Sequence, residues 1–400
     1  MGLAGRDLKP RCVAAGASRA TALTRPDRRK PFMNGAGAER RWGHTTFPFH
    51  NGKGDGMHIG VPRETKSHEG RIAFTPAAVQ ELVDAGHAVS VETGAGVASG
   101  FADSEYLAAG ARTGTRTQVW SETDIVVKVK EPQSDEVAML QAGQTLFCFL
   151  HLAAVPDLGP ALAARGVTAL AFEMLFANGA LPLLAPMSEI AGRLSIQIGA
   201  HLLEQAGGGR GVLLGGIPGV ETGRVVVLGA GTAGLAAAGL AAAFGTAVEV
   251  FDLKREALGR ARAIGPNVSA LFAEPAAIGE AVRAADLVIG AVLVPGARAP
   301  VVVTRAMVEA MRPGSVIVDI SVDQGGCVAT TRPMHHGEAP YAVNGVLHST
   351  ITNLPGIVPR TSTLALSGVL MPWVRRLANP DWRGDPALAG AISVDDQRVI

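Results

Sequence analysis

The polar side chains with the clearest chemical potential stand at the ends of short aliphatic, β-branched runs. Such runs are typical of buried strands. In an open parallel sheet, ligands bind outside the carboxyl ends of the strands, so polar residues there are candidates for a binding site. These residues, with the preceding run in parentheses, are Arg71 (58–62), Lys128 and Lys130 (125–129), His151 (145–149) and Asp323 (316–320).

The residue types suggest how such a site would work. Arg71 and one lysine would clamp a small carboxylate, since a guanidinium can hold both carboxylate oxygens. His151 would exchange the proton of an amine or a carbonyl. Asp323 would position water or orient the histidine. Because Lys128 and Lys130 are two residues apart, we expect them to point to the same face, with one of them simply solvated.

Each of these residues also has a plainer interpretation. Arg71 alone would be half of a surface ion pair, and His151 alone would be a local hydrogen-bonding residue. All of them at strand ends flanking one cleft make a shared site the better hypothesis.

A second chemical motif is the glycine-rich turn Gly229-Ala230-Gly231-Thr232-Ala233-Gly234. It follows an aliphatic run, opens an alanine-rich helical stretch, and precedes a second run that ends in Asp252. This is the context that a dinucleotide-binding turn requires. The three glycines allow the tight turn, the approach of a pyrophosphate and close helix packing, while the helix N-terminus attracts phosphate.

The acidic residue after the second run indicates which dinucleotide binds. Asp252 would accept hydrogen bonds from the adenosine ribose hydroxyls, which favours NAD over NADP. Lys254 and Arg255 weaken that preference slightly, because their positive charges could bind the 2′-phosphate of NADP.

The elements that must position these residues alternate between strands and helices from residue 57 onward, which predicts βαβ units and parallel sheets. We expect an α/β fold of two doubly wound Rossmann-like domains that face each other across a cleft. Residues 57–182 plus 360–400 would form a substrate (catalytic) domain, and 183–359 an NAD-binding domain. Expected strands are 58–62, 88–92, 125–129, 145–149, 167–171, 224–228, 247–251, 287–291 and 316–320; expected helices include 232–244, 256–263, 275–284, 304–311 and 363–377.

Two local patterns need separate comment. Thr75 caps a predicted helix that has Pro76 at its first position and Gly86 just past its end.

Residues 225–248 carry no charge and are long enough to suggest a membrane span. Their internal glycines instead divide them into strand, turn, helix and strand, so we expect a soluble protein.

The composition fits a protein with large aliphatic cores and no nucleic-acid partner. Of the 400 residues, 48% are hydrophobic, 18% charged and only 4% aromatic. The net charge of +1 conceals 11 basic and 4 acidic residues within 1–56, so the remainder is mildly acidic. The three cysteines show no metal-binding spacing, which predicts reduced thiols, no metal and a cytoplasmic location.

Residues 1–56 lack hydrophobic periodicity and an apolar segment of signal-peptide length. They are rich in arginine, which also allows a transit peptide. Met57 opens the first strand-like run and would make a natural first residue. We therefore expect a disordered or non-native extension.

With these motifs in view, the chain resembles the alanine dehydrogenase family, which includes NAD(P) transhydrogenase alpha chains, over essentially all of residues 57–390. The segments that carry the resemblance are 60–66, 71–76, 128–132, 149–153, 185–193, 229–234, 290–296, 323–326 and 358–363.

The resemblance implies an activity and a role for each candidate. The reaction would be the reversible NAD-dependent oxidative deamination of L-alanine to pyruvate and ammonia, in a homohexamer. Arg71 and Lys130 would bind the substrate carboxylate, and His151 and Asp323 would be catalytic. The residues implied for cofactor binding are Ser188, Gly229, Gly231, Gly234, Asp252 and Asn353.

Three features depart from the family pattern. Ser349 stands where an aromatic residue is usual, and Leu354 where Met or Ile is common; both are expected near the nicotinamide. The chain also ends about one helix early, after Ile400, which would weaken assembly.

Other functions stay open at this point. One is the NAD-binding part of a proton-translocating transhydrogenase. In that function His151 and the carboxylate clamp would have no role. Another is a non-catalytic NAD-binding regulator. A third keeps the chemistry but uses glycine and glyoxylate, because a pocket discriminates one methylene by only about 1–3 kcal/mol.

Overall fold

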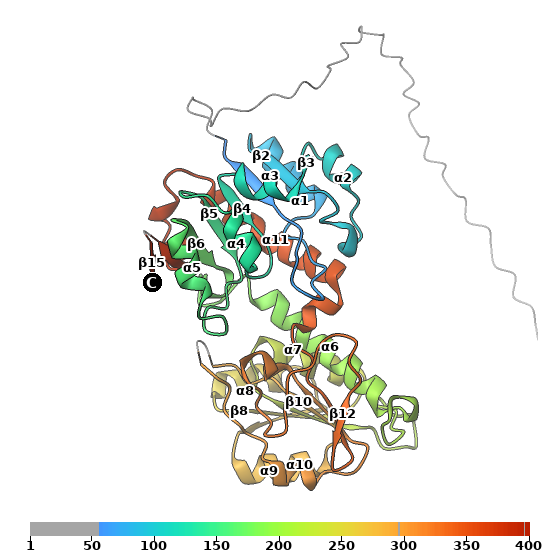
Figure 1. The fold of residues 1–400 in the computed structure, drawn as a ribbon. Coiled ribbons are helices and arrows are strands. Elements are labelled where there is room, and N and C mark those ends of the chain that lie inside the picture. The colour runs from blue at the N-terminus through green and yellow to red at the C-terminus, as the bar shows by residue number, and fades with distance from the viewer. Residues whose placement is uncertain (1–55, 295–296, 396) are drawn as a thin grey trace, which may run out of the picture. The chain divides into compact units, whose positions relative to one another are not determined.

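The computed structural model describes residues 56–294, 297–395 and 397–400, all within the compact unit Gly54–Ile400. The expectation of a disordered extension, and Cys12, lie outside the described residues. Within this unit the strands form two separate sheets (Figure 1).

The first sheet has eight strands in the order β15-β14-β6-β5-β4-β1-β2-β3. Its six earlier strands pair in parallel, and β14 and β15 add an antiparallel edge. The strands are β1 (His58–Val61), β2 (Ala88–Glu92), β3 (Arg112–Gly114), β4 (Ile125–Val127), β5 (Thr145–Cys148), β6 (Thr168–Ala171), β14 (Ile392–Asp395) and β15 (Arg398–Val399).

The second sheet has seven strands in the order β12-β13-β11-β10-β7-β8-β9. All neighbours pair in parallel except β12 and β13, which form an antiparallel hairpin at one edge. The strands are β7 (Arg224–Leu228), β8 (Ala247–Asp252), β9 (Val268–Phe272), β10 (Leu287–Gly290), β11 (Val316–Asp319), β12 (Tyr341–Val343) and β13 (Val346–Ser349).

Helices connect the strands of both sheets, as the alternation predicted. The α-helices are α1 (Pro76–Asp84), α2 (Asp103–Ala108), α3 (Arg116–Ser121), α4 (Ser134–Met139), α5 (Leu158–Ala164), α6 (Ala185–Leu203), α7 (Thr232–Ala243), α8 (Arg255–Arg262), α9 (Pro275–Ala284), α10 (Arg305–Glu309), α11 (Pro359–Leu377) and α12 (Pro386–Ala389). The short 3₁₀ helices include η2 (Phe172–Met174), η4 (Ile320–Gln324) and η5 (Leu354–Ile357). The α/β class with two Rossmann-like domains is confirmed.

Helix α1 shows how closely local sequence fixes an element. The Thr75 hydroxyl accepts from the backbone N–H of Ala78, and Pro76 is the first helical residue. Gly86 follows the helix with φ +92°, a conformation that glycine adopts without steric cost. The start and end of this helix are confirmed.

Two long helices determine how the cores are built. Leu366, Leu370 and Val374 of α11 pack in one buried cluster with residues of β1 and α1, which confirms that the C-terminal stretch returns to the first sheet (Figure 1). Helix α6 contributes to two cores: Leu194 lies in the first-sheet cluster, and Ile196 lies in a second-sheet cluster.

Several strands were not predicted. β9 is an edge strand in which Leu271 and Phe272 are exposed. Its sequence therefore lacks the pattern of a buried strand. β12 and β13 are joined by Asn344 and Gly345, both with positive φ, as a tight hairpin turn requires. No helix among the described residues is long and apolar enough to span a membrane.

Candidate active site

The glycine turn after β7 has room only for glycine at two of its positions. Gly229 has φ +99°, and a Cβ built there would lie 2.5 Å from the carbonyl oxygen of Ala291. A Cβ on Gly234 would lie 1.8 Å from the carbonyl oxygen of Gly229. The turn is therefore closed against the residue that follows strand β10 on one side and against the start of α7 on the other.

The third glycine leaves an open approach to the helix. Nothing among the described residues lies within 4 Å of a Cβ built on Gly231. Gly231 is the N-cap of α7 and provides no side-chain acceptor for the first-turn N–H groups. These uncapped donors, at the positive end of the helix dipole, fit a dinucleotide pyrophosphate.

Asp252 ends β8 beside this turn. Its carboxylate accepts from the backbone N–H of Ala230 at 2.7 Å and of Lys254 at 2.8 Å. The carboxylate thus stands at the glycine turn, where a ribose diol would reach it. Turn, helix N-terminus and carboxylate together fit a bound dinucleotide.

Ser188 lies on α6, the helix that packs against α7. Gly192, one turn further along α6, lies so close to α7 that a Cβ on it would sit 2.1 Å from the carbonyl oxygen of Ala233. Residues four apart share a helix face, so Ser188 is on the side of α6 that faces the start of α7.

Arg71 is held in a buried ion pair rather than at the surface. Its side chain is 2% exposed, and that of Glu69 is fully buried. Arg71 Nε donates to Glu69 Oε1 at 2.7 Å, and a terminal nitrogen donates to Oε2 at 2.5 Å. Burial alone would raise the pKa of Glu69, but the hydrogen bonds and charge of Arg71 lower it to about 2.

Asn353 joins this pair from the segment before η5. Its side-chain oxygen accepts from Arg71 at 2.8 Å, and its amide nitrogen donates to Glu69 at 2.9 Å. Its backbone N–H lies 3.3 and 3.4 Å from the carboxylate oxygens of Asp323. Asn353 has φ +54°, a strained conformation that these contacts hold in place.

Lys130 and His151 meet at the ends of neighbouring strands β4 and β5. Lys130 Nζ lies 3.3 Å from His151 Nε2. Burial and then the charge of Lys130 lower the pKa of His151 to about 4, while burial and then the charge of Arg71 lower the pKa of Lys130. Near neutral pH the imidazole is therefore uncharged and able to accept a proton.

Glu173, in η2, fixes the backbone of the histidine. Its carboxylate accepts from the N–H of Leu150 at 3.2 Å and of His151 at 2.6 Å. His151 has φ +48°, so its direction depends on these contacts rather than on strand geometry. The Phe149 ring stacks parallel to the imidazole at 5.6 Å between centroids.

The expectation that Lys128 or Lys130 is simply solvated is wrong. Lys128 is fully buried, with Nζ 3.0 Å from Glu64 and 3.1 Å from Glu136. Strand β4 ends at Val127, so the alternation that would place both lysines on one face does not continue to Lys130. The first lysine organises the loop, and the second reaches the histidine.

Asp323 lies in η4, beyond β11. Although the residue is exposed to solvent, the protein packed around the carboxyl raises its pKa, and the charges of Lys130 and Lys66 act in the opposite direction. Asp319, fully buried at the end of β11, anchors the same loop through the N–H groups of Cys327 and Val328. Asp323 is thus brought into the electrostatic field of the first sheet's cations.

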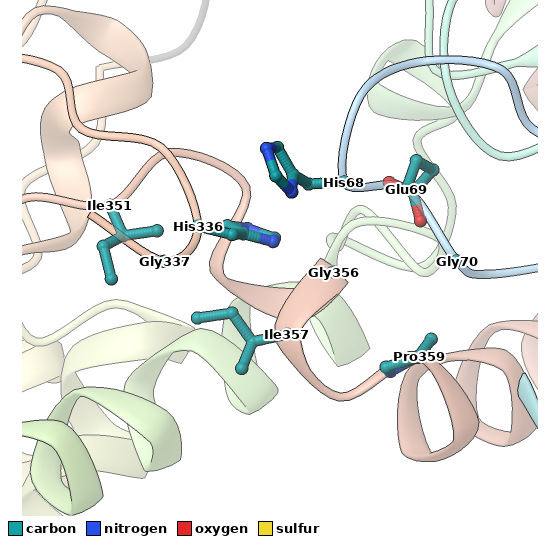
Figure 2. Close-up of a pocket in the computed structure, with 9 residues that line it drawn as sticks. All are labelled: His68, Glu69, Gly70, His336, Gly337, Ile351, Gly356, Ile357 and Pro359. Carbon is teal, nitrogen blue, oxygen red and sulfur yellow. The ribbon is translucent and has the colours of Figure 1, made fainter. Parts of the chain in front are cut away.

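Glu69 also lines a pocket of about 520 Å³, together with His68 and His336 (Figure 2). The rings of these two histidines lie 5.5 Å apart between centroids. His336 Nε2 is within hydrogen-bonding distance of the Asn353 carbonyl oxygen, so the pocket wall supports the clamp. None of Arg71, Lys130 and His151 lines this pocket, and we do not place the substrate in it.

The structure brings the predicted residues into two groups. The glycine turn and Asp252 form one, with Ser188 on the facing side of α6; the other comprises Arg71, Lys130, His151, Asp323 and Asn353. Sequence reasoning missed Glu69 and Glu173. Glu69 is two residues before Arg71, and this spacing was the available signal; Glu173 carries none.

Comparisons with known proteins agree with this architecture. The family model for the N-terminal domain of alanine dehydrogenase/PNT matches residues 60–191, and the C-terminal domain model matches residues 195–400. An alanine dehydrogenase of Mycolicibacterium smegmatis is 48% identical over 351 residues, which cover 86% of this chain and 95% of the relative.

Solved structures give the same result. An L-alanine dehydrogenase superposes with a TM-score of 0.82 at 48% identity, covering 86% of this chain and 97% of the other. A transhydrogenase from Sinorhizobium meliloti superposes with a TM-score of 0.75 at 26% identity, covering 86% and 98%. With both domain models matched and nearly half of the residues shared with a relative of similar length, the chain belongs to the alanine dehydrogenase/PNT family.

Proposed function

We propose that the protein is an NAD-dependent alanine dehydrogenase, which converts L-alanine, NAD⁺ and water reversibly to pyruvate, ammonium, NADH and a proton. The family supports the assignment. The observation that carries it is the 3.3 Å contact between Lys130 Nζ and His151 Nε2. Lys130 is close enough to Arg71 and to Asp323 to interact with both charges. A carboxylate clamp next to an uncharged imidazole suits an α-amino acid.

Arg71 and Lys130 would hold the substrate carboxylate and fix the direction of Cα–H. Glu69 and Asn353 already use Arg71 Nε and one terminal nitrogen. The other terminal nitrogen contacts only the Met187 sulfur, at 3.1 Å, among the described residues. Sulfur is a weak acceptor, so this nitrogen is the one to receive the substrate. Positioning of this kind supplies much of an enzyme's rate.

His151 would act as the acid/base. When NAD⁺ is bound, it supplies the hydride acceptor. Loss of hydride from alanine leaves an imine, which water attacks at carbon while His151 accepts the water proton. Asp323 would orient that water. His151 would return the proton to nitrogen and then accept the proton of the carbinolamine hydroxyl as ammonia leaves and the carbonyl of pyruvate forms.

The cofactor would lie along the glycine turn. Gly229, Gly231 and Gly234 with the N-terminus of α7 would bind the pyrophosphate, and Asp252 the adenosine ribose. Ser188 would contact the phosphates.

We further propose Asn353 for the nicotinamide end, since it lies against the clamp and Asp323. We assign substrate binding to residues 57–182 plus 360–400, and cofactor binding to residues 183–359. The resemblance also supports a homohexamer, which light scattering would reveal as six times the 41.1 kDa chain mass. The buried free Cys148 and Cys327 support a cytoplasmic location.

The first test is NADH formation from L-alanine and NAD⁺, measured beside a His151→Ala variant. We expect robust turnover in the natural chain and a loss of about 10²- to 10⁴-fold in the variant, with NADH binding retained. If NAD binds without alanine turnover, the dehydrogenase assignment fails. Glycine would be tried next, and then a regulatory or transhydrogenase role.

A further inference from the structure

Glu69 has the clearest unexplained role near the site. It is a fully buried carboxylate directed at the very arginine that is proposed to bind a substrate carboxylate. An ion pair that occupied all of Arg71 would block the site. The geometry shows that it occupies only one edge, formed by Nε and one terminal nitrogen.

The grip of Glu69 on Arg71 is more extensive than a simple ion pair. Besides both guanidinium contacts, Glu69 Oε1 accepts from the Arg71 backbone N–H at 3.0 Å. Glu69 Oε2 also accepts from Asn353, whose own oxygen accepts from Arg71. Glutamate, arginine and asparagine thus form a closed ring of hydrogen bonds, in which no partner can rotate alone.

This ring has a defined orientation relative to the catalytic groups. The Arg71 terminal nitrogen outside the ring has only the thioether of Met187 as a partner within the described part of the chain. Asn353 continues from the ring to Asp323 through its backbone N–H. The free edge of the arginine and the carboxylate of Asp323 are therefore positioned by the same asparagine.

We infer that Glu69 is a positioning residue: it fixes Arg71 so that a substrate carboxylate meets one nitrogen, at a defined place relative to His151 and Asp323. This inference rests on the proposed function. Glu69 has two opposing effects on substrate binding. The negative charge of Glu69 weakens the attraction of Arg71 for an anion, but the fixed geometry favours the reactive pose.

These opposing effects predict an unusual kinetic change in Glu69→Gln. The amide keeps the size of the side chain but removes the charge and one acceptor, so Arg71 becomes freer and more attractive to carboxylate. We expect kcat to fall about 10- to 100-fold, because misplacement by about 1 Å costs as much. We expect the KM for L-alanine to stay within about threefold or to fall.

The partner of Glu69 provides a second readout. In an Arg71→Lys background the fork that Glu69 grips is absent, so Glu69→Gln should change kcat by less than about threefold. The Kd of NADH should not change in any of these variants, because the glycine turn is not part of the ring. A rise in KM, an unchanged kcat, full additivity, or a parallel loss of NADH affinity would each overturn the inference.

Stability is controlled separately. Asp286→Asn removes another buried carboxylate that is paired with an arginine, since Asp286 lies 3.0 Å from Arg210. Asp286 precedes the first residue of β10, at the end of the strand away from the glycine turn. The substitution should lower Tm without changing kcat or KM. If Glu69→Gln does not fold, Glu69→Asp takes its place. It keeps the charge but not the reach, so kcat should fall while the KM for L-alanine stays within about threefold. A natural chain without alanine turnover would instead refute the proposed function.

Discussion

The cofactor turn and the substrate clamp are built on opposite principles. The turn depends on side chains that are missing: Gly229 and Gly234 each lie where a Cβ would overlap a backbone oxygen. The clamp and the neighbouring ion cluster of Lys128, Glu64 and Glu136 depend on long charged side chains that are buried and neutralised by charged partners.

The difference explains what each region can tolerate. A backbone turn is specified by a few consecutive residues and fails by steric overlap. A buried ion cluster brings together charged residues from separate segments, such as Glu64 with Lys128, and fails by leaving a charge unpaired. The second kind of failure depends on pH, whereas the first does not.

The largest effect is expected in the ion cluster. Lys128→Met would leave Glu64 buried without its cation and Glu136 with only Arg116, at 3.5 Å, and should reduce the free energy of unfolding by about 3–5 kcal/mol. Burial already raises the pKa of Glu64, although Lys128 lowers it, so loss of the lysine would raise that pKa further. Urea denaturation of the variant and the natural chain, at about pH 5 and pH 8, measures the loss.

The sign of the pH effect follows from linkage. The folded variant would bind a proton at Glu64 that the unfolded chain, with an ordinary glutamate pKa, has released. The destabilisation should therefore be smaller near pH 5 and grow as pH rises. Arg193→Met, which removes an exposed pair with Glu189, should have little effect at either pH. Equal losses at both pH values would contradict the account of a buried, unpaired carboxylate.

A smaller effect is expected in the cofactor turn. Gly234→Ala would place a methyl 1.8 Å from the carbonyl oxygen of Gly229, so the turn must shift. We expect about 1–3 kcal/mol of destabilisation, as for other overpacked sites, and a loss of NADH affinity that exceeds tenfold. The melting temperature and an NADH titration by fluorescence would show both.

The same helix offers a matched control. Gly239, further along α7, has nothing within 4 Å of a built Cβ among the residues described. Gly239→Ala should therefore be neutral or stabilise by up to about 1 kcal/mol, with NADH affinity unchanged. If the two substitutions behave alike, steric overlap is not what specifies the turn.

The comparison also shows what the sequence could predict. The glycine turn, Asp252 and the capped helix from Pro76 are local, so their geometry follows from neighbouring residues. Lys128 was wrongly expected to be a candidate for solvation because its partner Glu64 meets it only after β1 and β4 pair. Its other partner, Glu136, is eight residues further along the chain in α4, and the strand pattern gave no sign of that contact. Glu173 and His151 likewise meet only in the folded sheet.

Other misses have different physical reasons. The hairpin of β12 and β13 was not predicted although Asn344 and Gly345 form a strong turn signal. Its strands are only three and four residues long, too short for a clear alternation. The asparagine at 353 was placed near the nicotinamide by resemblance, whereas its hydrogen bonds to Arg71 and Glu69 required the structure.

The smallest expected effect is a pKa shift within the clamp. Burial first, and the charge of Lys130 second, hold the pKa of His151 near 4. Lys130→Met removes the second cause and leaves the first, so the pKa of His151 should rise toward, but not reach, its ordinary value near 6.5. NMR titration of ring-labelled histidine, with His151→Gln for assignment, would measure it.

A matched substitution tests whether that shift is specific. Lys66 also lowers the pKa of His151, but its contribution is smaller and its side chain is 38% exposed, so Lys66→Met should shift the pKa less. Because catalysis requires the uncharged imidazole, the acid limb of kcat/KM should move upward with the His151 pKa. No shift in Lys130→Met would mean that burial alone keeps the imidazole neutral. In that case Lys130 serves the substrate carboxylate without tuning the base beside it.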